Sequence, residues 1–215
     1  MKLYKFRALK QKIDFERLVD ILESGKFWCS KFYTMNDPME GIYLSNGTED
    51  DVAKIFSEKN NYLICSFAGE KGLLEPLMWG YYANGFKGVV IEVEIDESQI
   101  KKFKQITYRP KIPMTKNVLT ILTTKLCSWC HEDEWRYLCQ DSFGEKGKNI
   151  QIGKITGIYL GRPYKDATNS EQIISSYDPL KNYYEWQNEL KSIANEKNIF
   201  VKEVKISSNK VRIKN

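Results

Sequence analysis

Histidine is nearly absent from this chain, because only one of its 215 residues, His131, is a histidine. Any site that needs a histidine base or ligand must therefore use that residue. Long apolar stretches are missing as well: nowhere do about 18 apolar residues follow one another, and the first residues show no apolar signal segment. We therefore expect a soluble, cytoplasmic protein without a membrane partner.

The common nucleotide-binding and zinc-protease motifs are also missing. The sequence has no G-x-G-x-x-G, no P-loop and no H-E-x-x-H. The net charge of +5 is modest, and no five or six bases stand in a row. Such a charge permits a nucleic acid or a nucleotide phosphate as a partner without requiring one. The five cysteines, an odd number, predict reduced thiols rather than a disulfide framework.

The patterns that are present predict both strands and helices. Hydrophobic residues make up 42% of the chain and aromatic residues 13%, which argues against a disordered chain. Alternating apolar residues predict strands, and helical spacing predicts helices. Strands are expected at 3–7, 26–30, 61–68, 88–95, 106–109, 131–138, 150–160, 200–206 and 210–213, and helices at 13–24, 75–84 and within 170–198. Residues 116–124 fit either a strand or a helix.

The order of these elements indicates the α+β class. No internal repeat or linker interrupts the chain, so we expect a single domain over residues 1–215, with a mixed or mainly antiparallel sheet flanked by helices. Its motifs lie within 3–160, and a looser helix and hairpin occupy 165–215. Asp14 is expected to cap the first helix and Gly25 to end it, and the C-terminal helix is expected to break near Asp178-Pro179.

The segment 131–138 is the strongest candidate for chemistry. Apolar and charged residues alternate in it, so that a strand would place Glu132, Glu134 and Arg136 on one face. Two carboxylates beside a cation suit a reactive site, because each shifts the proton affinity of the other. A cross-strand salt bridge on a solvated face is the structural alternative.

Two further motifs have a metal or haem interpretation. Cys127-x-x-Cys130-His131 matches covalent haem attachment, which needs an export signal that we do not find, and a zinc site would need a fourth ligand. Buried thiols are the preferred interpretation. The acids of Asn36-Asp37-Pro38-x-Glu40 could hold a divalent cation, but a tight turn fixed by side-chain hydrogen bonds is preferred. We therefore expect no haem and no metal.

Several of these motifs, taken in order, resemble an uncharacterised bacterial domain family. The resemblance covers most of residues 3–160 and brings no established activity with it. Its motifs are Tyr4-Lys5-Phe6-Arg7, Asn36-Asp37-Pro38-Met39-Glu40, Cys65-Ser66-Phe67, Leu77-Met78-Trp79-x-x-Tyr82-Ala83, Lys87-Gly88-Val89-x-Ile91-Glu92, Lys125 and Trp129-x-x-Glu132-x-Glu134-Trp135-Arg136.

A more distant resemblance does imply an activity. Arg7, Ser66 and Glu132-x-Glu134 follow one another on expected strands, as in ADP-ribosyltransferases of the Arg-Ser-Glu type. The Ser-Thr-Ser triplet of the better-known members is absent, since Phe67 follows Ser66. The resemblance implies an ADP-ribosyltransferase-like fold, with NAD as the substrate and a protein or nucleic acid as the acceptor. A bacterial toxin or phage-defence effector would fit this activity.

The same resemblance assigns roles to individual residues. Glu134 would stabilise the positive charge that develops on the ribose as the nicotinamide bond breaks. Glu132 would orient or deprotonate the acceptor, Arg7 would hold the pyrophosphate, and Ser66 would lie with it in the NAD site. Tyr81 or Tyr82 would stack on nicotinamide. We expect Glu134→Gln to remove activity with little loss of stability, because a solvent-accessible carboxylate adds little to folding.

Two other functions remain open from the sequence. A metal-dependent nuclease could use acidic residues with a neighbouring cation, and a non-catalytic binding module of a defence system could use an aromatic cleft. The nuclease residues would be Asp37, Glu40, Glu92, Glu132, Glu134 and Lys125. A purely structural alternative also exists, in which Arg136 pairs with Glu132 or Glu134, Arg7 pairs with Glu40 or Glu92, and Trp79, Tyr82 and Trp135 belong to the core.

Overall fold

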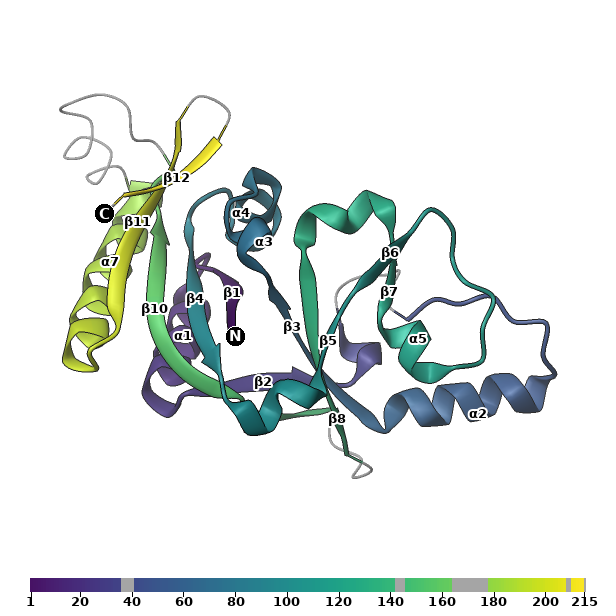
Figure 1. Cartoon of the computed structure of the whole chain (residues 1–215). Coiled ribbons are helices and arrows are strands. Elements are labelled where there is room, and N and C mark those ends of the chain that lie inside the picture. Colours follow the sequence, from purple (N-terminus) through teal and green to yellow (C-terminus); the bar gives the residue numbers. More distant parts are fainter. Residues whose placement is uncertain (36–40, 142–145, 164–177, 208–209, 215) are drawn as a thin grey trace.

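The computed structural model describes residues 1–35, 41–141, 146–163, 178–207 and 210–214, and it confirms the α+β class (Figure 1). Most strands join one curled sheet in the order β12-β11-β10-β4-β1-β3-β2-β9, and β8 pairs with β3 and β5. The pairs are antiparallel except β10 with β11, so the sheet is mixed but mainly antiparallel, as expected. A separate parallel pair joins β6 and β7.

The strands are β1 (Lys2–Ala8), β2 (Lys26–Ser30), β3 (Tyr62–Ala68), β4 (Gly88–Ile95), β5 (Phe103–Gln105), β6 (Thr107–Arg109), β7 (Thr124–Leu126), β8 (Glu134–Gln140), β9 (Gly147–Gln151), β10 (Gly153–Gly161), β11 (Phe200–Ser207) and β12 (Lys210–Lys214). The helices are α1 (Lys12–Ser24), α2 (Glu49–Asn60), α3 (Glu70–Leu73), α4 (Pro76–Tyr82), α5 (Val118–Leu122) and α7 (Asp178–Glu196), with 3-10 turns η1 (Phe32–Thr34), η2 (Glu97–Lys102) and η3 (Cys127–Glu132). No helix of the described residues is both long and apolar enough to cross a bilayer.

The sheet is nearly divided between β1 and β3. Strand β1 pairs with β4 over its whole length, from Lys2 to Ala8, but with β3 only at Tyr4 opposite Ala68. Strand β3 in turn pairs with β8 over its whole length. We call the β1–β3 junction the seam. It separates the part of the sheet with β1, β4, β10, β11 and β12 from the part with β3, β8 and β5 (Figure 1).

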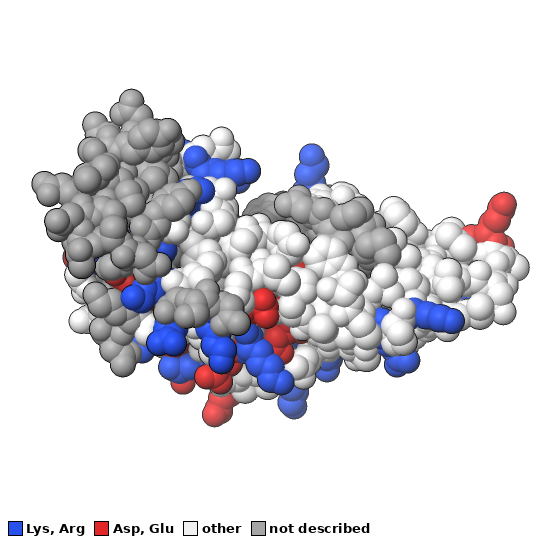
Figure 2. Space-filling view, turned by 90° about the horizontal axis from the view of Figure 1, so that it is seen from above, with Lys and Arg blue, Asp and Glu red and all other residues white. Residues whose placement is uncertain are grey.

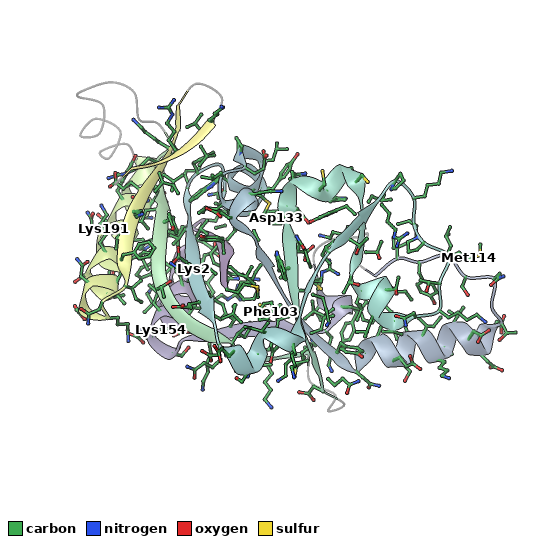
Figure 3. The ribbon with its side chains drawn as sticks, in the orientation of Figure 1. Lys2, Phe103, Met114, Asp133, Lys154 and Lys191 are labelled. Carbon is green, nitrogen blue, oxygen red and sulfur yellow. The ribbon has the colours of Figure 1, made fainter. Side chains whose placement is uncertain are left out.

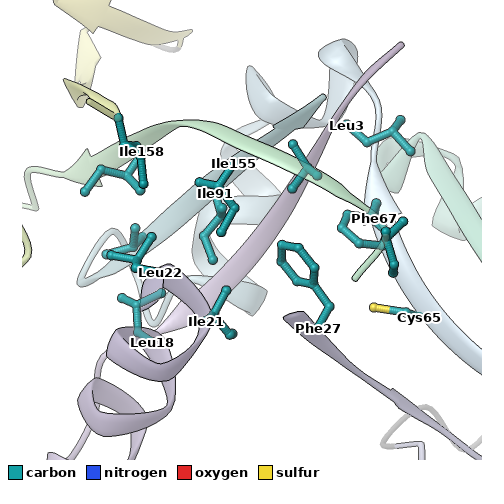
Figure 4. Packing of buried hydrophobic residues seen from close by; sticks show 14 of the residues in the cluster. Leu3, Leu18, Ile21, Leu22, Phe27, Cys65, Phe67, Ile91, Ile155 and Ile158 are labelled. Carbon is teal, nitrogen blue, oxygen red and sulfur yellow. The ribbon is translucent and has the colours of Figure 1, made fainter. Parts of the chain in front are cut away.

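Helices pack on both faces of the sheet. The alternation of β4 directs Val89, Ile91 and Val93 to the face covered by α1 and α7, and Val90 to the face covered by α3 and α4. Figure 4 shows how Leu18, Ile21 and Leu22 of α1 face the isoleucines of β4 and β10. A third cluster lies under α2 and α5. These helices hold the strands on either side of the seam in place.

Two local expectations were wrong, and one helix was missed. Asp14 does not cap α1: it lies in the first turn after the cap Gln11, where its Oδ2 accepts hydrogen bonds from the backbone N–H groups of Lys10 and Gln11. The helix α2 was not predicted. Strand β8 begins at Glu134 rather than at residue 131. The described helix α7 starts at Asp178, the position near which a break was expected, and residues 164–177 lie outside the described part of the chain. Gly25 ends α1 as predicted, with a left-handed φ of 67°. The ambiguous segment 116–124 contains α5 and the start of β7.

Candidate functional site

A cleft with a volume of about 970 Å³ lies at the seam. Strands β1 and β3 line it with α1, β2 and α4, and residues of β7, η3 and β8 complete its wall. Its size falls in the range of small-molecule sites. Seven of the residues singled out from the sequence line it: Lys5, Arg7, Ser66, Tyr82, Lys125, Glu132 and Glu134.

Both carboxylates of the E-x-E motif meet at Lys125. The Lys125 Nζ lies 2.7 Å from Glu132 Oε2 and 2.8 Å from Glu134 Oε2. The expected geometry was wrong, however, because Glu132 ends η3 and Asp133 takes a left-handed φ of 46° before β8 starts. Asp133 is labelled at this turn in Figure 3. The acids are therefore brought together by a lysine of β7, and not by alternation along one strand.

Glu134 belongs to a buried ion pair. Arg136 donates to it from Nε at 2.8 Å and from Nη2 at 3.2 Å, and also from Nη1 to the Leu122 carbonyl at 2.6 Å. Glu134 is 4% exposed and Arg136 is 0% exposed. The expectation of a solvent-accessible Glu134 was therefore wrong, and the structural alternative of an Arg136–Glu134 pair is confirmed.

The charges of this cluster stabilise one another. Burial alone would raise the pKa of Glu134, but Arg136 and Lys125 outweigh it and hold that pKa well below its ordinary value. Burial would likewise lower the pKa of Lys125, yet the two glutamates raise it above its ordinary value. Glu134 and Lys125 are therefore both charged at neutral pH.

One tyrosine binds the Glu132 carboxylate, and a second binds the backbone of Glu134. The Tyr82 hydroxyl donates a hydrogen bond to Glu132 Oε1. Burial is the main cause that raises the pKa of Tyr82, and the Glu132 carboxylate is the second. The Tyr108 hydroxyl accepts the backbone N–H of Glu134 at 2.8 Å. Tyr82 is partly open to solvent and lines the cleft, whereas exposed Tyr81 is not among the residues that line it, and the centre of its ring lies 6.2 Å from that of His131. Of the two tyrosines expected to stack on nicotinamide, only Tyr82 lines the cleft.

The opposite wall of the cleft is basic. Lys5 Nζ crosses the seam and donates to the Ser66 carbonyl at 2.7 Å, while the Ser66 hydroxyl has no partner in the described part of the chain. Arg7 is half-buried, and no described residue forms a hydrogen bond or an ion pair with it. Burial lowers the pKa of Arg7 from its ordinary value, and nearby Arg17 contributes in the same direction. The nearby Asp14 carboxylate opposes this lowering of the pKa without forming an ion pair, so the guanidinium lies in the cleft with no ion-pair or hydrogen-bond partner among the described residues.

Glu92 and Trp79 are structural residues of the fold. Glu92 is buried on the far face of β4, where it pairs with Lys2 at 2.7 Å and accepts hydrogen bonds from Thr156 and Tyr159. It therefore neither pairs with Arg7 nor joins Glu132 and Glu134, which removes one acid from the nuclease hypothesis. Trp79 is fully buried and donates to the Leu73 carbonyl. Asn36, Asp37 and Glu40 lie outside the described residues.

Sequence reasoning missed part of the cleft, including Trp28. Arg17, Lys26, Trp28 and Asn149 also line it. Trp28 is 54% exposed, and its indole lies against the backbone of β9, since a Cβ at Gly147 would come within 2.4 Å of Trp28 Cζ2. The sequence contained a signal for the exposure of Trp28, because it alternates along β2 with Phe27 and Cys29, which are buried.

The C-x-x-C-H motif does not build a metal centre. Cys127 and Cys130 are exposed on η3, so the expectation of buried thiols for this motif was wrong. No three histidine, cysteine or acidic side chains in the described ranges are grouped to hold a metal ion. Charges of both signs intermingle at one end of the face seen in Figure 2, so that this face does not present a single basic patch.

Comparisons of the chain with protein-family models, curated proteins and solved structures found no match. The cleft is therefore the feature from which a function is inferred. Its distinguishing property is that Arg7 lies on the β1 wall without an ion-pair partner among the described residues, whereas the charges around Lys125 on the other wall are paired with one another.

Proposed function

We propose that the cleft binds NAD and that the chain is an ADP-ribosyltransferase-like protein, related to the bacterial domain family whose motifs it shares. The observation that carries this proposal is the half-buried Arg7 guanidinium, which lies in the cleft without a partner among the described residues. A desolvated cation without a counter-ion costs folding free energy, and an anionic ligand would remove that cost. A pyrophosphate suits it, because guanidinium groups form paired hydrogen bonds with phosphate oxygens.

Aromatic side chains at two places in the cleft support a ligand with two rings. Tyr82 lines the wall near Glu132, and Trp28 presents an exposed indole from β2. Nucleotide bases stack on such rings with a gain of about 1–3 kcal/mol per base. A dinucleotide would then have its phosphates at Arg7 and a base at each aromatic side chain. The cleft volume of about 970 Å³ is sufficient for a ligand of that size.

The acidic cluster supports the transfer step. Cleavage of the nicotinamide–ribose bond develops positive charge on the ribose, and a fixed carboxylate nearby stabilises that charge as it forms. Arg136 and Lys125 keep Glu134 ionised and immobile, which gives it the role of this fixed charge. Glu132, which accepts from Tyr82 and Lys125, would orient the acceptor. We propose a protein or nucleic acid as the acceptor and a toxin or defence effector as the biological role.

Calorimetric titration with NAD tests the binding step. Wild type should bind NAD saturably, and Arg7→Ala should weaken binding about tenfold to a hundredfold, the effect of a charged hydrogen bond. Lys104→Ala makes the same change in net charge at an exposed position away from the cleft and should leave binding unchanged. Absence of binding at millimolar NAD with folded protein would exclude the proposal.

Turnover separates an enzyme from a binding module. Release of nicotinamide by wild type, lost in Glu132→Gln while NAD still binds, would support the transferase. NAD binding without turnover in any acceptor mixture would instead identify a binding module. A chelator should have no effect on the activity, and an activity that a chelator abolishes would favour the nuclease.

A further inference from the structure

The turn that connects the two halves of the charge cluster carries a pair of thiols. Lys125 precedes η3 and Glu132 ends it, and between them Cys127 and Cys130 are both exposed to solvent. The proposed transfer reaction does not use either thiol. The other cysteines lie on other elements: Cys29 and Cys65 are buried within β2 and β3, and Cys139 lies within β8.

The geometry of η3 favours a bond between these two thiols. Side chains three residues apart eclipse one another on a 3-10 helix, so Cys127 and Cys130 lie on the same side of the turn. With a rise of about 2.0 Å per residue, their Cα atoms are about 6 Å apart along the axis. Disulfides join Cα atoms that are about 4.4–6.8 Å apart. The Cα spacing thus lies within the disulfide range, and closure requires the two Cβ atoms, which are about as far apart on eclipsed side chains, to approach to about 3.5–4.5 Å.

We propose that Cys127 and Cys130 form a redox-active dithiol that takes glutathione-type disulfides as its oxidising substrate. The thiolate of one cysteine attacks a sulfur of the disulfide, whose S–S bond breaks and whose leaving thiolate takes up a proton. The second cysteine loses its proton, attacks the mixed disulfide and releases the second thiol. Two protein thiols are oxidised, one low-molecular-weight disulfide is reduced, and two low-molecular-weight thiols are released.

The position of the dithiol couples it to the cleft wall. Closure forms a ring that contains Ser128 and Trp129, and the Trp129 side chain lines the cleft with its ring 5.6 Å from the Lys125 Nζ. The backbone directly after this ring leads to Glu132. Oxidation thus fixes the turn that positions the Glu132 carboxylate. The fluorescence of Trp129, which lies inside the ring, should change when the disulfide forms.

One tryptic peptide makes the reaction measurable. Cleavage after Lys125 and after Arg136 releases residues 126–136, which contain both cysteines of the pair and no other, and the adjacent peptide 137–146 contains only Cys139. The full-length protein is equilibrated in mixtures of reduced and oxidised glutathione, trapped with iodoacetamide, digested and weighed by mass spectrometry. Peptide 126–136 should become two hydrogens lighter, without alkylation and without glutathione. Trp129-dependent fluorescence should change in parallel and recover with a reductant.

Variants of single cysteines provide the controls. Cys127→Ser and Cys130→Ser should each retain one glutathione on the remaining thiol and lose the reversible fluorescence change, whereas Cys139→Ser should behave like wild type. The proposal is overturned if the wild-type peptide remains fully alkylated in oxidised glutathione, if it carries one or two glutathiones, or if either thiol links to Cys139. None of these outcomes depends on NAD binding, so the dithiol and the proposed transferase can fail separately.

Discussion

Arg136 holds both carboxylate oxygens of Glu134, with Nε 2.8 Å from Oε1 and Nη2 3.2 Å from Oε2, at a position where neither residue has more than 4% of its surface exposed. This pair gives Glu134 a fixed orientation and a fixed charge beside the cleft. It also makes the site part of the folding core, so that stability and chemistry are linked at this position. The first three predictions test that link.

Arg136→Met should destabilise the protein strongly. The substitution removes a fully buried partner and leaves the Glu134 carboxylate with only Lys125, and breaking a buried pair typically costs about 3–5 kcal/mol. Urea denaturation of both proteins measures the difference. The matched control is Lys12→Met, which breaks the exposed 3.6 Å pair with Glu16 and should cost less than about 0.5 kcal/mol. Equal effects at the two positions would contradict the buried-pair description.

The two glutamates should differ in their effect on stability. Glu134→Gln leaves buried Arg136 without its carboxylate and should cost about 3–5 kcal/mol. Glu132→Gln should cost only about 1–2 kcal/mol, because Lys125 keeps Glu134 and the new amide oxygen still accepts from Tyr82. Glu132→Gln is therefore the better probe of catalysis, and denaturant titration of both variants checks the order. A larger loss for Glu132→Gln would reverse this assignment.

Acid should remove the contribution of Glu134. Its pKa in the folded protein lies below the ordinary value of 4.5, so its stabilisation is complete above about pH 4.5 and declines as the pH falls toward the folded-state pKa. The free energy of unfolding should then decrease with a slope of up to about 1.4 kcal/mol per pH unit. The difference between wild type and Glu134→Gln, measured from neutral pH to about pH 3, should become smaller below pH 4.5. A constant difference over that range would show that the carboxylate is not stabilised by its charge.

Gly147→Ala should displace Trp28. A Cβ at this position would come within 2.4 Å of Trp28 Cζ2 and 2.6 Å of the Cys29 carbonyl oxygen, so the indole must move. We expect a shift in tryptophan emission and weaker NAD binding. Gly80→Ala is the matched control, because a Cβ there meets no atom within 4 Å, and alanine in α4 should add up to about 1 kcal/mol of stability. Unchanged emission in Gly147→Ala would show that Trp28 does not rest on Gly147.

The sequence predicted the regular elements better than the contacts of the site. Strands β1 and β4 follow from alternation and apolar content, and Gly25 marks the end of α1. The start of β8 did not follow from alternation, because Asp133 takes a left-handed φ and its carbonyl accepts the N–H of Gly69, which is far away in the sequence. Local patterns contain no information on such a contact.

The same limitation applies to burial of the charged residues. Alternation correctly paired Glu134 with Arg136 on one face of a strand, but it predicted a solvated face. Burial arises because α5 and β7 cover that face, and Leu122 and Lys125 supply the partners. The segment that contains α5 and the start of β7 was the one whose pattern fitted either a helix or a strand. Because the pattern of residues 116–124 did not distinguish a helix from a strand, it did not predict that this segment would cover Glu134 and Arg136.

The seam also determines how the sheet responds to mechanical stress. A single register pair, Tyr4 with Ala68, and the Lys5 contact to Ser66 join β1 to β3, whereas β1 and β4 are paired along their full length. Fewer backbone hydrogen bonds oppose rotation there than along the fully paired strands β1–β4 and β3–β8, and the β2–β3 junction likewise has one register pair, Ser30 with Ile64. The sheet should therefore open first at these sparsely paired junctions. A ligand that contacts Arg7 of β1 and Ser66 of β3 would brace the β1–β3 junction, because it would add contacts across a line where few backbone hydrogen bonds join the strands.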